Sequence, residues 1–90
     1  MRRSKAAIIY EILEVVVRNG GEVSPTQLSL EANLAYDRMM RLLESLEERG
    51  LVEIASGEGR KWVRITRKGQ ELYHHLKHVR RILSDFGISL

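Results

Sequence analysis

The 90-residue sequence contains no cysteine. This absence excludes disulfide bonds, thiolate catalysis and cysteine-ligated zinc, and it fits a reducing compartment. No apolar run is long enough to span a membrane, because the longest, in "ILEVVVRNGG", is far shorter than the roughly 20 residues required. The N-terminal residues show no signal-peptide pattern. We therefore expect a soluble protein of the cell interior.

The features on which most enzymes depend are also missing. The stretch "SGEG" lies between two strand-like runs and lacks the lysine and serine that follow a phosphate-binding loop. No nucleophile is paired with a base, and the acids fall on predicted exposed helix faces. There is no repeat, low-complexity tract or linker, and a chain this short cannot bury two independent cores. We expect a single domain that is not an enzyme and uses no cofactor.

The charges are nearly balanced in total but are segregated along the chain. Lys and Arg number 15 against 12 Asp and Glu, for a net charge of +3. The first five residues carry three cations, and "RKWVRITRK" carries five with no acid. The intervening "ESLEERGLVEIASGE" holds five glutamates and one arginine. This segregation indicates a cationic surface that can meet phosphates, and the alternative is a solvated, salt-bridged surface.

Apolar spacing and capping residues predict three helices in the first half of the chain. The pattern in "SKAAIIYEILEVVVRNGG" predicts a helix over residues 4–18 that two glycines end. In "SPTQLSLEAN", Ser24 is an N-cap followed by proline at the first helical position and by Gln27 three residues on, which is a capping box. This second helix is short because Asn33 interrupts it. A third helix begins near Ala35 and ends before Gly50.

The third helix is amphipathic. Its polar face holds Asp37, Arg38, Arg41, Glu44, Ser45 and Glu48, and its broad apolar face holds Ala35, Tyr36, Met39, Met40, Leu42, Leu43 and Leu46.

A hairpin and a last helix follow. The runs "LVEIA" and "KWVRIT" flank "SGEG", which is a hairpin signal. Thr66 can cap a last helix that ends near Phe86. Its apolar residues recur at spacings of 4, 3, 4 and 3, a seam of about two heptads formed by Leu72, Leu76, Val79, Leu83 and Phe86.

The predicted order is helix, helix, helix, hairpin, helix. Two short helices joined by a tight turn and followed by a hairpin describe a winged helix-turn-helix, a mostly α fold with a small β-hairpin wing. Here it carries an additional C-terminal helix. We expect residues 1–66 to form the DNA-binding winged helix and residues 67–90 to form a dimerisation element within the same domain.

Three stretches resemble the archaeal 10a family of winged-helix DNA-binding proteins. They are "SKAAIIYEILE", "ANLAYDRMMRLLESLEERGLVE" and "ITRKGQEL", and the likeness covers nearly the whole chain. The family usually has a longer C-terminal helix that pairs with its mate in an antiparallel coiled coil. The resemblance implies a homodimer that binds double-stranded DNA as a transcriptional regulator or nucleoid-associated protein. It also implies a cytoplasmic location at the nucleoid.

The third helix is the predicted recognition helix, and its DNA-binding candidates are Tyr36, Arg38, Arg41 and Ser45. Arg38 and Arg41 lie one turn apart and can each bridge O6 and N7 of guanine or clamp a phosphate. The alternative for Arg41 is pairing with an acid of the same helix, Glu44 or Glu48. Asp37 either compensates the helix dipole or accepts from a cytosine amino group. The glutamates of the back half repel phosphate, so only the N-terminal end is expected to enter DNA.

The hairpin is the predicted second contact, with Arg60, Lys61 and Arg64 on the DNA backbone. Alternation with Val63 places Trp62 on the outer face beside Arg64, and the alternative is a core tryptophan. The cations in "TRKG" stand where the helix dipole disfavours them, so a nearby phosphate would explain their position.

The last helix offers a second copy an apolar seam, and we expect Leu76, Val79, Leu83 and Phe86 to form the dimer contact. The alternative is packing within the monomer. A two-fold dimer would address paired half-sites. Three histidines, at positions 74, 75 and 78, have the spacing for two metal ligands but no third, so we expect no metal site. No membrane contact or small-molecule ligand is expected either. The rival function is a protein-interaction module that uses this seam and Trp62.

Overall fold

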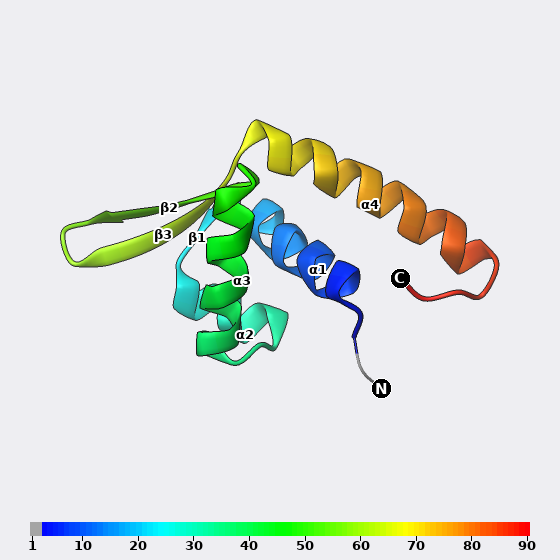
Figure 1. Ribbon diagram of the computed structural model, residues 1–90, viewed down its shortest axis with the longest axis horizontal. Coiled ribbons are helices and arrows are strands. Elements are labelled where there is room, and N and C mark those ends of the chain that lie inside the picture. Colours follow the sequence, from blue (N-terminus) through cyan, green and yellow to red (C-terminus); the bar gives the residue numbers. More distant parts are fainter. Residues whose placement is uncertain (1–2) are drawn as a thin grey trace.

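The computed structural model describes residues 3–90, so Arg2 of the N-terminal cationic segment lies outside the described residues. The helices and strands follow the predicted order, with one additional short strand (Figure 1). They are α1 (Lys5–Arg18), β1 (Glu22–Val23), α2 (Pro25–Ala32), α3 (Tyr36–Glu48), β2 (Val52–Gly57), β3 (Arg60–Ile65) and α4 (Arg67–Asp85). The predicted winged helix-turn-helix with a C-terminal helix is confirmed.

The helix boundaries follow from local capping. The side-chain oxygens of Ser24 and Thr66 accept from the backbone N–H three residues on, at 3.1 and 3.0 Å. Each cap of this kind stabilises a helix by about 1 kcal/mol. The capping box is only half formed, because the Gln27 side chain donates to Glu31 rather than returning to Ser24. Asn33 ends α2 in the left-handed conformation, with φ of 53°, and this turns the chain into α3.

The sheet has the antiparallel order β1-β3-β2. Its hairpin register runs from Val52 opposite Ile65 to Gly57 opposite Arg60. Glu58 and Gly59 both have positive φ, 51° and 75°, which is the geometry of a two-residue hairpin turn. The predicted four-residue loop "SGEG" is therefore wrong, since its first two residues belong to β2. The sequence also failed to predict β1, because two residues carry no periodic signal.

The core forms around α1. This helix packs against α2, α4 and both β1 and β3, and α3 packs against α2 and β2. The largest fully buried side chains are Ile12, Leu13, Leu28, Met39, Leu43, Val16, Val52 and Val63. Ala35 and Tyr36 were predicted on the apolar face of α3 but are exposed. The first turn of α3 borders a surface groove instead of covering the core.

The molecule is elongated, with extents of 47 × 28 × 22 Å. Figure 1 shows the hairpin wing and the end of α4 projecting to opposite sides of the helical body. After α4 the chain turns back toward α1, where the Ser4 hydroxyl donates to the Leu90 carbonyl oxygen at 3.0 Å. None of the helices within residues 3–90 combines the length and apolar character needed to span a membrane.

Candidate nucleic-acid interface

The front half of α3 presents two exposed arginines. Neither Arg38 nor Arg41 takes part in an ion pair within 4 Å among residues 3–90. The alternative pairing of Arg41 with Glu44 or Glu48 is thus absent from this structure. An exposed guanidinium without an internal partner keeps all of its donors available to an external acceptor. Both side chains therefore remain candidates for base or phosphate contacts.

The back half of α3 is tied to its surroundings. The Glu47 carboxylate accepts from the Ile54 backbone N–H of β2 at 2.8 Å, so this acid joins the helix to the wing. The prediction that Glu47 serves to repel phosphate missed this structural role. Ser45 is half-buried, and its hydroxyl accepts a hydrogen bond from Arg49. The Ser45 hydroxyl hydrogen is not used in that bond and remains available as a donor.

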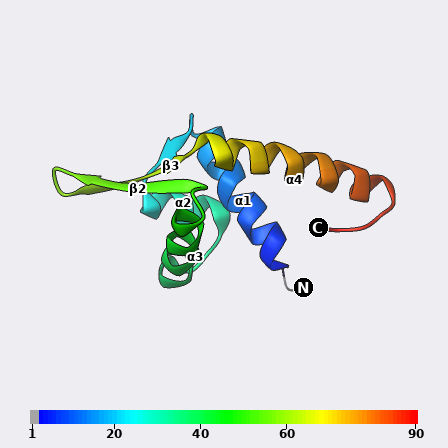
Figure 2. The same ribbon diagram turned by 45° about the horizontal axis from the view of Figure 1, so that its top comes forward.

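A groove of about 580 Å³ lies between the wing, the start of α2 and the start of α3. The structure thereby brings Tyr36 together with Arg60, Lys61 and Trp62, while Ser24, Pro25, Thr26 and Gly59 complete the lining. Figures 1 and 2 both show α3 lying beside the base of the wing. The indole of Trp62 is half-buried, on the opposite face of β3 from the fully buried Val63. Trp62 is therefore a groove side chain rather than a core tryptophan.

The wing cations differ in whether an acid of the chain pairs with them. The Arg64 Nε donates to Glu22 of β1 at 3.2 Å, and the cross-strand partner of Arg64 in β2 is another acid, Glu53. Arg60 and Lys61 are exposed, and no ion pair within residues 3–90 includes them. Sequence reasoning treated the three cations as equivalent. It could not predict the Glu22 contact because β1 itself was not predicted.

Arg3 was counted in the cationic surface but points inward. Its guanidinium donates to the backbone oxygens of Ala32 at 2.9 Å and Asn33 at 2.8 Å, and it also pairs with Glu11. These oxygens lie at the end of α2, where a helix leaves carbonyls unsatisfied. Arg3 thus holds the turn between α2 and α3 from a position some 30 residues earlier in the chain. Nothing in the local sequence pattern signals this contact.

A second polar cluster fastens α2 to α1. Glu31 accepts from Arg18 at 3.1 Å and from Asn19 at 3.3 Å, and the Gln27 amide also donates to it. The Gln27 amide and then the Arg18 guanidinium hold the pKa of Glu31 below its ordinary value. Together with the Arg3 contacts, this cluster keeps α2 in one position beneath α3.

The exposed apolar stripe of α4 differs from the predicted seam. Leu76 and Leu83 are half-buried, and Leu76 packs on the core. Val79, Ile82 and Phe86 are the exposed members, and Phe86 is the most exposed at 76%. Ile82 was missed because it breaks the 4-3 spacing on which the prediction rested. Among residues 3–90, no group of three or more acidic or histidine side chains is placed to hold a metal ion.

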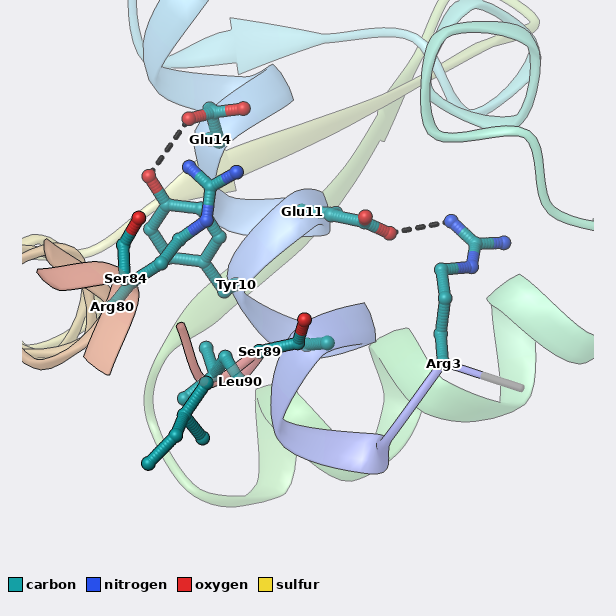
Figure 3. A pocket seen from close by; sticks show the side chains of 10 residues that line it. Arg3, Tyr10, Glu11, Glu14, Arg80, Ser84, Ser89 and Leu90 are labelled. Carbon is teal, nitrogen blue, oxygen red and sulfur yellow. Dashed lines mark hydrogen bonds and ion pairs between the residues drawn. The ribbon is translucent and has the colours of Figure 1, made fainter. Parts of the chain in front are cut away.

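A hollow of about 410 Å³ separates α1 from the second half of α4 (Figure 3). The Tyr10 hydroxyl donates to Glu14 at 2.8 Å, and the Arg80 guanidinium lies 5.1 Å from the Tyr10 ring centre. Burial, and then the Glu14 hydrogen bond, raise the pKa of Tyr10 to about 12. Figure 3 also shows Arg3 paired with Glu11 on the α1 side of the hollow. Its charged side chains therefore already have partners within the chain.

The sequence matches a family model described as winged helix-turn-helix over residues 2–84. That range spans every helix and strand except the final residue of α4. This chain belongs to the winged helix-turn-helix family. No curated protein matches the sequence.

Solved structures share the winged helix-turn-helix fold with this chain. Sso10a-2, a DNA-binding protein from Sulfolobus solfataricus, is 24% identical with a TM-score of 0.82, over 93% of this chain and 85% of that one. F93 from STIV, a winged-helix DNA-binding protein, is 20% identical with a TM-score of 0.78, over 86% of this chain and 90% of that one. The first likeness agrees with the resemblance to the 10a family.

A longer protein shares the fold as well. The oxidised form of MarR from E. coli is 19% identical with a TM-score of 0.71. The match covers 80% of this chain but only 52% of MarR. At these identities the likenesses show a common winged helix-turn-helix fold.

Proposed function

We propose that this protein binds double-stranded DNA as a homodimer, with α3 in the major groove and the wing on the sugar-phosphate backbone. The observation that carries the proposal is a set of exposed cations without partners in residues 3–90, on two neighbouring elements: Arg38, Arg41, Arg60 and Lys61. Sso10a-2 and F93, which share the fold, are described as DNA-binding proteins. The role we propose is that of a regulator or nucleoid-associated protein and not of an enzyme.

The charge distribution along α3 favours docking by its N-terminal half. The major groove admits one helix and exposes base edges to its side chains. Arg38 and Arg41 can reach guanine or phosphate there, whereas the exposed Glu44 and Glu48 farther along would be repelled by phosphate. Ser45 lies between these charges, and its hydroxyl can donate to DNA while its oxygen accepts from Arg49.

The groove beside α3 suits one strand of the DNA backbone. Arg60 and Lys61 supply charge at its rim, and the rings of Tyr36 and Trp62 supply apolar surface for a deoxyribose. Contacts of this kind position a protein on the duplex without reading its sequence. Arg64 is a secondary backbone contact because Glu22 competes for its guanidinium.

Two observations support association: the area that the whole chain exposes, and the exposed apolar side chains of residues 67–90. The chain exposes 6190 Å², whereas a compact monomer of 10.4 kDa is expected to expose about 5400 Å². The surplus, about 800 Å², equals one partner's share of a standard-size protein interface. Residues 67–90 hold the apolar stripe of Val79, Ile82 and Phe86, with Leu76 and Leu83 at its edge. A two-fold pair of such helices would present two copies of α3 to paired half-sites.

The decisive experiment is a salt series of binding to a duplex of about 30 base pairs, roughly three helical turns. The Arg38→Ala/Arg41→Ala double variant should lose tight binding while its circular dichroism and thermal unfolding stay unchanged. Each arginine that bridges a guanine accounts for about 1–3 kcal/mol. Arg81→Ala, which removes an exposed cation of α4, serves as the control. Normal affinity in the double variant would disprove the assignment of α3.

The same measurement distinguishes the proposed roles. Equal affinity for random and genomic duplexes with a steep salt dependence indicates a nucleoid-associated protein, and enrichment of one paired site indicates a regulator. Absence of binding at low salt, together with salt-insensitive association with another protein, would favour the rival protein-interaction module.

A further inference from the structure

The start of α4 is bonded to the end of α3. The Thr66 hydroxyl donates to the Gly50 carbonyl oxygen at 2.6 Å and accepts from the Gly69 backbone N–H at 3.0 Å. The Thr66 backbone N–H donates to the Leu51 carbonyl oxygen at 3.1 Å. Gly50 and Leu51 are the residues by which the chain leaves α3. One side chain therefore joins the C-terminal end of α3 to the first turn of α4.

Gly69 brings the two segments into backbone contact. It is buried, and a Cβ added there would overlap the Leu51 carbonyl oxygen and lie 2.8 Å from Ile65 Cγ1. Contacts that close require a residue without a side chain. The first turn of α4 consequently rests directly on the backbone that follows α3, with no side-chain layer to permit sliding.

Farther along, α4 is held against α1. The rings of Tyr73 and Tyr10 stack with their centroids 5.5 Å apart and an interplanar angle of 12°. Arg80 then covers the Tyr10 ring from the next part of α4. The helix is thus fixed at its root by Thr66 and Gly69 and along its length by this stack. The stack fixes α4 relative to α1, whereas Thr66 and Gly69 are the contacts that fix it relative to the end of α3.

Because α4 is long, a small rotation at its start displaces its far end by several ångströms. Ile82 lies about 20 Å along the helix axis from Gly69, at 1.5 Å per residue. A rotation of about 10° at the root would shift the two ends relative to each other by about 3.5 Å, the spacing of one base pair along a DNA strand. A fixed separation between two copies of α3 therefore needs a junction that does not bend.

We propose that Thr66 is a positioning residue that couples the orientation of α4 to that of α3 and so fixes the separation of the two copies of α3 in the dimer. The proposal rests on the homodimer proposed above. Of the two hydrogen bonds of the Thr66 hydroxyl, the one donated to Gly50 is critical because it reaches the end of α3. The one accepted from Gly69 only caps α4.

The test measures the distance between the two copies of α3 directly. The chain has no cysteine, so Glu48→Cys at the exposed end of α3 gives one spin-label site per protomer for pulsed electron paramagnetic resonance. In this background we compare Thr66→Val, which removes the hydroxyl, with Thr66→Ser, which retains it. Thr66→Asp keeps an acceptor for the Gly69 N–H but cannot donate to Gly50 when ionised.

A narrow distribution of inter-label distances is expected when residue 66 is threonine and in Thr66→Ser. Thr66→Val and Thr66→Asp should broaden the distribution or shift its mean by about 3.5 Å or more, with unchanged dimer mass. Should Thr66→Val fail to fold, Thr66→Asp still separates coupling from capping. Identical distributions in a folded Thr66→Asp dimer would overturn the proposal. If the Glu48→Cys protein with Thr66 unchanged has a monomeric mass and gives no inter-label distance, the homodimer on which this proposal rests is refuted.

Discussion

The wing cations should contribute unequally to DNA binding, because Glu22 pairs with only one of them. Arg60 and Lys61 have no ion pair within residues 3–90, whereas Arg64 donates to Glu22 at 3.2 Å. Each cation that neutralises a phosphate adds about 0.9 to the slope of log K against log salt concentration. The Arg60→Ala/Lys61→Ala variant should therefore lower the slope by about 1.8 for each wing on DNA, and by about 3.6 for a dimer with both wings engaged.

Glu22 provides the matched test of this reasoning. Arg64→Ala should lower the slope by less than about 0.9 per wing, because Arg64 must break its pair with Glu22 before it meets a phosphate. Glu22→Gln should have the opposite effect, raising both affinity and slope, since it frees Arg64 and removes an acid from the wing. Its cost to stability should be small, because exposed ion pairs are worth about 0–1 kcal/mol.

The assay is fluorescence anisotropy of a labelled duplex between about 50 and 200 mM salt, where such slopes are large. Arg81→Ala, which removes one positive charge far from the wing, controls for the effect of net charge in the single variant Arg64→Ala. An unchanged slope in Arg60→Ala/Lys61→Ala would remove the wing from the interface. A decrease in slope of about 0.9 per wing for Arg64→Ala, the full value for a free cation, would refute the argument from the Glu22 pair.

Two further outcomes are expected. Ile82→Asp should convert the dimer to monomers in sedimentation analysis because it places a charge in the exposed stripe. Leu30→Asp, at an equally apolar exposed site on α2, should leave the mass unchanged. A dimeric Ile82→Asp would disprove the assignment of the stripe as the dimer contact. Because the pKa of Glu31 is held below its ordinary 4.5, its stabilising contribution is complete above that pH and is lost as the pH falls through the lowered pKa. Urea unfolding at about pH 7 and about pH 3 should show a smaller acid destabilisation for Glu31→Gln, and equal acid sensitivity would contradict the assignment.

Local signals predicted most of the fold. The caps at Ser24 and Thr66, the interruption of α2 at Asn33 and the apolar spacing of α1 and α3 act over one or two helical turns, so they can be read from neighbouring residues. The two-residue strand β1 gave no such signal. Its omission then concealed the Glu22 contact that separates Arg64 from the other wing cations.

The sequence named candidate residues for the site but not how they lie relative to one another. Sequence spacing identified the cations of α3 and the wing, and it placed Trp62 on the outer face of β3. It could not show that Trp62 and Tyr36 border one groove, because their approach depends on how α2, α3 and the hairpin pack. It also assigned Arg3 to the cationic surface, since a contact with the end of α2 crosses some 30 residues of chain.

The sequence by itself determined the order of the helices, their capping residues and the segregation of positive charge along the chain, because these depend on residue type and short-range spacing. The tertiary structure alone decided which charges are neutralised within the chain, which apolar residues of α4 remain exposed and how α4 is fastened to α3. Those outcomes depend on contacts between residues distant in sequence, such as Arg64 with Glu22 and Thr66 with Gly50. Such contacts exist only once the core around α1 has formed.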